Sequence, residues 1–204
     1  MTRPTPSPSA AAPHSVCVYC GSRSGTDPAF AALATSLGQA IGRRGWQLVY
    51  GGGRAGLMGL VADAALEAGA RVVGVIPESL MRMEVGHRGL TELHVVATMH
   101  ERKQMMAERA DAFIAMPGGI GTFEELFEVW TWRHLRYHDR PMGLLDASRY
   151  WEPLLRFLQS SVAAGFMDER QMAMLTVSQD PEAMLDALQA AGPGTAAPGR
   201  FDRI

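Results

Sequence analysis

The residues most suited to chemistry in this chain gather in one short stretch, PGGIGTFEEL, at positions 117–126. Its glycines leave backbone amides unshielded, so the stretch could cradle a phosphate. Two glutamates, Glu124 and Glu125, follow directly, and a carboxylate repels phosphate. The ligand to be explained is therefore one that needs both an anion cradle and an acid.

Glu125 has a structural and a functional interpretation. Thr122 and Glu125 have the spacing of a capping box, in which Thr122 begins a helix and Glu125 bonds back to the helix start. Helical geometry places Glu125 on the same face as Val129 and Trp132, which is unusual for a solvated carboxylate. The opposite, core-facing stripe is formed by Phe123, Leu126, Phe127 and Trp130. We therefore expect Glu125 to lie against a second buried surface, either a cleft wall or a partner subunit.

A second group of charged residues lies in TMHERKQMM, at positions 98–106. Thr98 and Glu101 have the capping-box spacing, so Glu101 is interpreted as structural. Arg102 and Lys103 then fall near the start of a helix, where a cation opposes the helix dipole. They are either solvated bases or the partners of an anion such as a phosphate or a carboxylate. Lys103 is also the only lysine of the chain.

Further glycine-rich stretches are CGSRSG at 20–25 and GGGRAGLMG at 51–59. We expect all of these loops at one edge of a sheet, where bare backbone can approach a ligand. Gly51, Gly53 and Gly56 have the G-x-G-x-x-G spacing of a dinucleotide site, and Glu78 lies where such a site has its ribose-binding acid. The competing structural interpretation is that these glycines form a tight turn that packs the helix onto the strand. A bound mononucleotide would explain more of the glycine-rich loops than either a dinucleotide or a tight turn.

The segments that carry these loops alternate between short apolar runs and amphipathic stretches. The predicted strands are 15–20, 47–50, 71–76, 93–96, 112–116 and 141–145. The predicted helices are 28–43, 57–68, 99–109, 123–135, 151–164 and 181–190. Such alternation predicts an α/β fold in which helices cover both faces of an open, mostly parallel sheet. Ligands of such sheets bind at the carboxyl ends of the strands, where the glycine-rich loops fall.

Together these motifs resemble a known family. The stretch PGGIGTFEE at 117–125 is similar to the PGGxGTxxE signature of the LOG ("Lonely guy") family, the cytokinin riboside 5′-monophosphate phosphoribohydrolases. MHERK at 99–103 resembles a second motif of that family, and CVYCGSR, LVYGGGRAGLMG, VVGVIP and EVWTW occur in the family's order. The resemblance covers about residues 15–190. Ile120 stands where the family often has Tyr.

The resemblance implies a Rossmann-like, doubly wound fold and a homodimer whose site lies near the subunit interface. The implied reaction is hydrolysis of the N-glycosidic bond of a cytokinin-type or adenine nucleoside 5′-monophosphate, which releases free base and ribose 5-phosphate. Arg102 and Glu125 would be the catalytic pair. Further substrate-binding residues would be Glu84, Met99, Lys103, Gly118, Gly119, Ile120, Gly121, Thr122 and Thr131, with Gly21, Ser22, Gly52 and Gly53 from the other loops. No metal and no cofactor is expected.

This chemistry fits the residue types of the first motif. Cleavage of a ribosyl C1′–N bond builds positive charge on the sugar, which a carboxylate stabilises, while loop amides bind the phosphate. The glycines and the acid then serve two ends of one ribose phosphate. Arg102 would either neutralise the phosphate or hold Glu125 in its ionised form.

Two alternatives to this enzyme remain. A non-catalytic carrier or sensor on the same fold would bind AMP without turnover. LOG-like proteins have also been labelled lysine decarboxylases, and a pyridoxal phosphate enzyme requires a Schiff-base lysine, for which Lys103 is the only candidate. The position of Lys103 beside Arg102, in the opening turns of a helix, favours anion binding instead.

Composition limits the class of partner. The 204 residues carry a formal net charge of −2, which argues against electrostatic binding of nucleic acid. The sequence has no apolar run long enough to span a bilayer, and its first residues lack the apolar segment of a secretory signal. We therefore expect a cytoplasmic protein with no membrane partner. Residues 1–14 and 191–204 are predicted to be tails around one catalytic domain, 15–190.

Cys17 and Cys20 form CVYC, a spacing that also occurs in redox and zinc sites. In an extended strand, residues three apart point to opposite faces, and their Cα atoms lie roughly 10 Å apart, beyond the reach of a disulfide. We therefore interpret both cysteines as structural.

Overall fold

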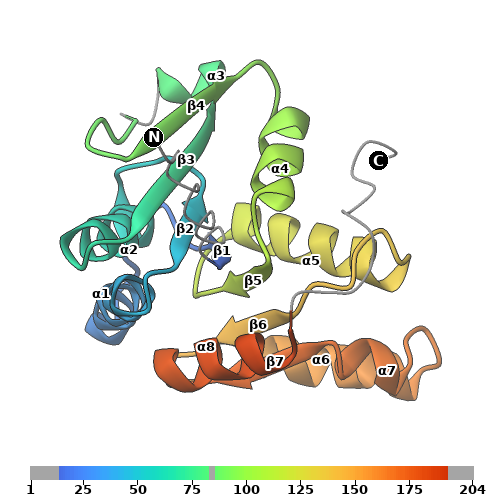
Figure 1. Ribbon diagram of the computed structural model, residues 1–204. Coiled ribbons are helices and arrows are strands. Elements are labelled where there is room, and N and C mark those ends of the chain that lie inside the picture. The colour runs from blue at the N-terminus through green and yellow to red at the C-terminus, as the bar shows by residue number, and fades with distance from the viewer. Residues whose placement is uncertain (1–13, 83–85, 193–204) are drawn as a thin grey trace, which may run out of the picture.

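The computed structural model describes residues 14–82 and 86–192. Its centre is a sheet of parallel strands in the order β4-β3-β2-β1-β5-β6-β7 (Figure 1). The strands are β1 Ser15–Tyr19, β2 Gln47–Tyr50, β3 Arg71–Pro77, β4 Glu92–Val96, β5 Ala112–Ala115, β6 Met142–Leu145 and β7 Leu175–Ser178. The predicted α/β fold is confirmed, and β7 is an edge strand that the sequence analysis missed.

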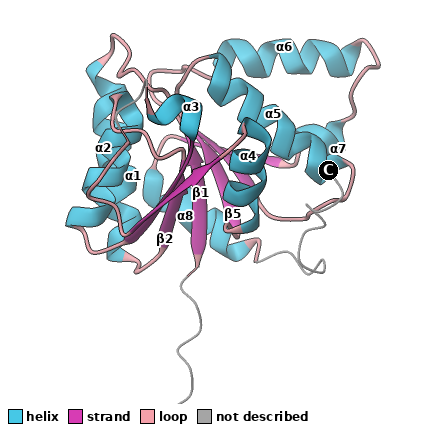
Figure 2. Cartoon of the chain, turned by 90° about the horizontal axis from the view of Figure 1, so that it is seen from above, coloured by secondary structure: helices cyan, strands magenta, loops and turns pink. Residues whose placement is uncertain are grey.

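Helices cover both faces of the sheet, as Figures 1 and 2 show. The helices α1 Pro28–Arg43, α2 Gly56–Glu67 and α8 Pro181–Ala190 pack on one face, and α4 Met99–Glu108, α5 Ile120–His134 and α6 Glu152–Ala163 pack on the other. Two short helices, α3 Glu78–Met81 and α7 Glu169–Met172, lie in the connections. Alternate residues of β1 enter the two cores, with Val16 and Val18 on the α1 side and Cys17 and Tyr19 on the α5 side.

The cysteines follow this alternation. Cys17 belongs to the core under α4, α5 and α6, whereas Cys20 belongs to the core under α1, α2 and α8, and both are free thiols. Burial raises the pKa of each thiol far above its ordinary value, so neither is a reactive thiolate. Their structural interpretation is confirmed.

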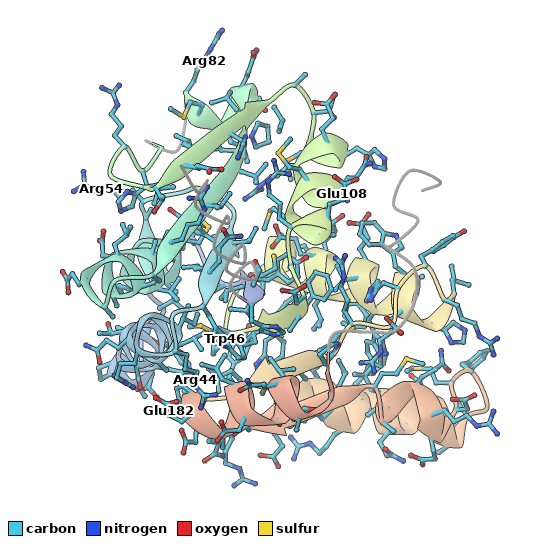
Figure 3. All side chains as sticks on the ribbon, in the orientation of Figure 1. Arg44, Trp46, Arg54, Arg82, Glu108 and Glu182 are labelled. Carbon is cyan, nitrogen blue, oxygen red and sulfur yellow. The ribbon has the colours of Figure 1, made fainter. Side chains whose placement is uncertain are left out.

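Ion pairs fasten α8 to the end of α1. Arg44 contacts Glu182 at 2.7 Å and Asp186 at 2.6 Å, and its guanidinium lies over the ring of Trp46 (Figure 3). These contacts lie far from the strand ends that carry the glycine-rich loops, so their role is to close the fold.

The order of the strands creates a switch point between β1 and β5. From β1 the chain adds β2, β3 and β4 in one direction, and α4 then returns it to β5 on the other side of β1. Tyr19 at the end of β1 pairs with Ala115 at the end of β5, so the loops that follow both strands begin side by side. In open α/β sheets ligands bind at such a point.

The start of α5 differs from the predicted one. The helix begins at Ile120 with Gly119 as its N-cap, so Thr122 lies inside the first turn and does not cap it. The predicted capping box of Thr122 and Glu125 is therefore wrong. Glycine is tolerated as an N-cap, and buried Thr122 instead packs against Gly118. At α4 the predicted Thr98 cap is confirmed, since its Oγ1 accepts the amide of Glu101.

Across residues 14–82 and 86–192, no helix combines the length and the apolar character needed to cross a bilayer. The predicted tails lie outside the described residues except for residues 14 and 191–192, and the single-domain assignment stays a prediction.

Candidate active site

A cavity of about 590 Å³ lies at the switch point, where the glycine-rich loops meet. Backbone hydrogen bonds join these loops: the amide of Gly21 donates to Pro117 O at 3.1 Å, and Gly21 O accepts the amide of Leu57 at 3.0 Å. The predicted site residues that line the cavity are Gly21, Ser22, Met99, Arg102, Gly118, Gly119, Ile120, Gly121, Thr122 and Glu125. Both members of the predicted catalytic pair are therefore in one cavity.

Glu125 is the one acidic residue among the described residues that line this cavity. It lies in the second turn of α5, and within the described part of the chain its carboxylate has no hydrogen-bond or ion-pair partner. Burial raises its pKa to about 7, and the nearby Arg102 opposes that shift. A carboxyl with this pKa can be ionised at neutral pH and can also accept a proton there.

The face that Glu125 shares with Val129 and Trp132 is a cleft wall of the chain itself. Both apolar residues are buried in the core formed with α4 and the sheet. They therefore give no support for a partner subunit at this face. The predicted core stripe also needs a correction, because Phe127 is 36 % exposed.

Arg102 is buried in the cavity wall, with 7 % of its surface exposed. Its Nε donates to Val75 O and its Nη2 to Gly51 O, each at 3.1 Å. A Cβ on Gly51 would lie 2.1 Å from Nη2, so the glycine leaves the space that the guanidinium occupies. These bonds fix the cation in place, while its remaining N–H groups are available to a ligand or to Glu125.

The glycines around the start of α5 divide into two kinds. A Cβ on Gly118 would lie 2.1 Å from Thr122 Oγ1 and 2.8 Å from the amide of Gly21, so Gly118 permits close packing of the loops. A Cβ on Gly119 or Gly121 would meet nothing within 4 Å. The first turn of α5 thus presents unshielded amides at the positive end of a helix dipole, an arrangement that binds anions.

Comparison with known proteins agrees with this geometry. The profile of a protein family described as "Possible lysine decarboxylase" matches residues 58–188. A cytokinin riboside 5′-monophosphate phosphoribohydrolase from Rhodococcoides fascians is 48 % identical over 178 residues, which cover 87 % of this chain and 90 % of that protein. A probable enzyme of the same name from Oryza sativa subsp. japonica, LOGL1, is 49 % identical over 152 residues, which cover 74 % of this chain and 68 % of the relative.

The chain belongs to the LOG family.

More distant solved structures share the fold of this LOG-family chain. A molybdenum cofactor binding protein from Rippkaea orientalis superposes with a TM-score of 0.66 at 19 % identity, covering 89 % of this chain and 98 % of the other. At such identity the likeness concerns the Rossmann-like architecture alone. The chemistry must be argued from the cavity.

Several residues that the LOG resemblance predicted for the substrate site do not line the cavity. Gly52 packs against Ile76 and Leu93, and Gly53 forms a β-bridge with Gly86. Thr131 is exposed on α5, where its hydroxyl donates to Phe127 O at 2.7 Å. Glu84 lies outside the described residues.

Lys103 also differs from its prediction. Its Nζ lies 2.5 Å from a carboxylate oxygen of Glu124 and 2.9 Å from one of Glu128, so it joins α4 to α5 and does not reach the cavity. Partial burial lowers its pKa, but the two carboxylates outweigh that effect and the net shift is upward. A Schiff-base lysine needs a neutral amine in the site. The position and the charge of Lys103 therefore both oppose the lysine decarboxylase alternative, although the matched profile carries that label.

The structure adds residues that the sequence analysis missed. Phe30, Leu80 and Tyr150 form part of the cavity wall, and Leu57 and Met58 reach it from the start of α2. Tyr150 lies in the loop after β6, which has no glycine-rich sequence to attract notice. The rule that ligands bind beyond the carboxyl ends of strands would have drawn attention to that loop.

Among the residues that the structure describes, no three His, Cys, Asp or Glu side chains come together in a group that could hold a metal ion. The polar side chains that line the cavity are the Glu125 carboxylate, the guanidinium groups of Arg23 and Arg102, and the hydroxyls of Ser22, Ser24, Thr122 and Tyr150, beside the amides at the start of α5.

Proposed function

We propose that this chain hydrolyses the N-glycosidic bond of a cytokinin-type or adenine nucleoside 5′-monophosphate to free base and ribose 5-phosphate. The observation that carries the proposal is the Glu125 carboxyl, with a pKa of about 7, in one cavity with the start of α5 and the Arg102 guanidinium. The names of the relatives from Rhodococcoides fascians and rice support this substrate class.

The start of α5 would bind the 5′-phosphate. The amides of the first turn have no partners within the helix, and the dipole adds a partial positive charge. Gly119 and Gly121 leave this turn open to the cavity. A phosphate at this position keeps its charge away from the Glu125 carboxylate.

Helix geometry sets the distance between the two ends of the ligand. Glu125 follows Ile120 by five residues along α5, which corresponds to a rise of about 7.5 Å. The path from the phosphorus to the anomeric carbon of a ribose 5-phosphate is shorter than this rise, and the Glu125 side chain, which leans toward the start of its helix, would cover the difference. One helix can therefore hold the phosphate at its first turn and place the acid beside the anomeric carbon.

The ionised carboxylate of Glu125 would stabilise the positive charge that develops on the ribose as the C1′–N bond breaks. A water molecule then adds its oxygen to C1′. Glu125 takes the proton that this water loses and passes it, directly or through solvent water, to the ring nitrogen of the departing base, so the carboxylate is regenerated and one water molecule is consumed.

Arg102 would serve as a fixed positive charge. Because its guanidinium is bonded to Val75 O and Gly51 O, it does not reorganise during the reaction. It lowers the pKa of Glu125 against the effect of burial and so favours the ionised acid. This supports the second of the two roles predicted for Arg102, while contact with the phosphate remains open to its other N–H groups.

The proposal is tested by incubating the protein with adenine and isopentenyladenine nucleosides, monophosphates and triphosphates and measuring free base by chromatography. We expect base to be released from the monophosphates, with little from nucleosides that lack the phosphate. Binding of AMP without release of base would instead support the carrier alternative. Equal cleavage of nucleosides and monophosphates would contradict the role of the α5 amides.

We also propose that the protein is a homodimer, as the LOG resemblance implies. The support on the described surface is a pair of exposed apolar side chains, Phe127 on α5 and Leu135 at its C-cap, with exposed fractions of 36 % and 55 %. The helix that carries the acid would then also carry part of the subunit interface.

A further inference from the structure

Tyr150 contacts the loop that begins α5. Its ring lines the cavity and packs edge-on against Phe30 at 5.8 Å and Trp151 at 5.0 Å between ring centroids. Its hydroxyl donates a hydrogen bond to Gly118 O. It is the side chain in the loop after β6 that touches both the cavity and the glycine-rich loop of the first motif.

The hydrogen bond from Tyr150 to Gly118 O also fixes the orientation of the whole Gly118–Gly119 peptide. A trans peptide is planar, so the carbonyl of Gly118 and the amide of Gly119 point in opposite directions. With glycine on both sides, this peptide would otherwise rotate readily. Holding the oxygen on the Tyr150 hydroxyl therefore determines where the Gly119 N–H points.

The preceding peptide is held in the same way from another loop. Pro117 O accepts the amide of Gly21 at 3.1 Å, which fixes the orientation of the Gly118 amide. The carbonyls directly before α5 are thus both occupied by donors of the protein. A carbonyl that turned into the cavity would place partial negative charge beside a bound phosphate and replace an N–H that could bind it.

The position of Tyr150 is itself specified by an unusual turn. Ser148 and Arg149, directly before it, adopt left-handed backbone conformations with φ of 53° and 58°. Ser148 Oγ donates to a carboxylate oxygen of Asp27, the residue that caps α1. Left-handed conformations of residues with side chains cost energy and occur where the surroundings impose them. The turn has the effect of placing the Tyr150 hydroxyl under Gly118.

We propose that Tyr150 is a positioning residue for the substrate phosphate: its hydroxyl orients the Gly118–Gly119 peptide so that the Gly119 amide faces the anion. This inference rests on the proposed function, since it assigns the phosphate to the start of α5. Tyr150 acts through Gly119 and does not take part in bond cleavage.

The test is Tyr150→Phe, which removes the donor and keeps the ring in place. Titration calorimetry with ribose 5-phosphate measures the cradle directly, without turnover. Loss of one hydrogen bond that orients a binding group predicts roughly tenfold weaker binding of ribose 5-phosphate. With AMP as substrate, KM should rise by about the same factor while kcat changes less than about threefold.

Tyr137→Phe is the matched control, because Tyr137 packs against the core beyond α5 and does not line the cavity. This variant should bind ribose 5-phosphate as the wild type does. Thermal unfolding of both variants reports on the fold. A general loss of packing by Tyr150→Phe would lower kcat together with affinity, whereas a positioning role affects KM and the dissociation constant.

The outcomes separate this inference from the proposed function. Unchanged affinity of Tyr150→Phe for ribose 5-phosphate, or a loss confined to kcat, would overturn the role of Tyr150. A wild type that binds ribose 5-phosphate but releases no base from any monophosphate would overturn the proposed hydrolysis while the calorimetric comparison still decides on Tyr150. A wild type that does not bind ribose 5-phosphate would contradict both.

Discussion

At the scale of single residues, Glu125 illustrates a conflict between stability and chemistry. The proposed reaction needs its carboxylate ionised, but burial favours the neutral acid and raises its pKa to about 7. Arg102 lowers the cost of ionisation without removing it. The charge that stabilises a developing ribosyl cation is therefore kept at some expense to the folded state.

We predict that Glu125→Gln loses activity and gains stability. The amide keeps the shape of the side chain but has no charge and accepts no proton, so turnover should fall by roughly a thousandfold or more. The folded protein binds the Glu125 proton more tightly than the unfolded chain does, so stability falls as pH rises from the ordinary glutamate pKa to about 7. At pH 8 the variant should exceed the wild type by about 1–3 kcal/mol in the free energy of unfolding.

Thermal or urea unfolding at pH 8 and pH 5 measures this difference in stability. The difference should shrink at pH 5, because Glu125 in the folded wild type is then largely protonated and as neutral as the glutamine of the variant. Ribose 5-phosphate binding serves as the control for an intact site. Wild-type turnover by Glu125→Gln, or lower stability than the wild type at pH 8, would contradict the assignment.

The pH dependence of the reaction gives a second residue-scale prediction. Because the ionised acid is required and its pKa in the free protein is about 7, kcat/KM should rise as pH increases through 7 and level off above about 8. The substrate phosphate also titrates, with a second pKa of about 6. Its contribution can be separated by measuring the pH dependence of AMP binding to Glu125→Gln. A wild-type profile that is flat from about pH 5.5 to 8.5 would be inconsistent with Glu125 as the essential base.

The sequence drew attention to Arg102 and Glu125, which the structure places in one cavity, but did not predict the contacts of their neighbours. Arg102 was noticed because a cation near a helix start opposes the dipole, and Glu125 because it shares a helix face with apolar residues, while their assignment as a catalytic pair comes from the LOG resemblance. Lys103 was expected to contact the substrate, but adjacent residues on a helix point about 100° apart, and Lys103 faces α5 instead. Tyr150 was missed because its contact with Gly118 joins residues that are distant in the sequence.

At the scale of elements, the glycine-rich loops serve mainly to bring backbone segments together. A Cβ on Gly56 would lie 2.4 Å from the amide of Arg23, and one on Gly51 would displace the Arg102 guanidinium. Only part of the glycine content, at Gly119 and Gly121, opens toward the cavity. The prediction that these loops approach a ligand therefore applies best to the start of α5, while Gly52 and Gly53 do not line the cavity.

Gly51→Ala tests this interpretation of the loop after β2. The added methyl group must move Nη2 of Arg102, which is the end of a flexible side chain, so the fold should survive while kcat falls by roughly tenfold to a hundredfold. A double-mutant cycle with Arg102→Ala isolates the mechanism. Gly51→Ala should cause little further loss when Arg102 is already absent; full additivity of the two losses would show that the methyl group acts elsewhere.

The sequence predicted the bounds of strands and helices well where the apolar periodicity is strong. It predicted them poorly where contacts with other parts of the fold determine where an element begins. All six predicted strands keep their order and lie within one residue of their predicted bounds, but β7 is a short edge strand with alternating burial and no apolar run. The start of α5 was placed at Thr122 because Thr is a good cap, while packing of Thr122 against Gly118 moves the helix start to Gly119. The correction matters for function, since it brings the amides of Ile120 and Gly121 into the first turn.

At the scale of the whole molecule, the site exists because the sheet is wound in two directions from β1 and β5. Loops from both halves meet at that point, and neither half alone supplies the acid, the cation and the anion cradle. A protein named for binding molybdenum cofactor has the same architecture at 19 % identity, so the fold alone does not decide the chemistry, which depends on the residues of the loops.

The subunit arrangement is the prediction that concerns the molecule as a whole. Val129 and Trp132 are buried within one chain, so the case for a homodimer shifts to the outer side of α5 and its C-cap, where Phe127 and Leu135 are exposed. Sedimentation at micromolar concentration should show a dimer for the wild type. Replacing Phe127 and Leu135 together by Glu places two charges in an apolar contact and should yield monomers with an unchanged circular dichroism spectrum. Phe166→Glu, at an 86 % exposed residue beyond α6, is the matched control and should remain dimeric. A monomeric wild type would contradict the homodimer, and a dimer that survives both Glu substitutions would place its interface away from α5.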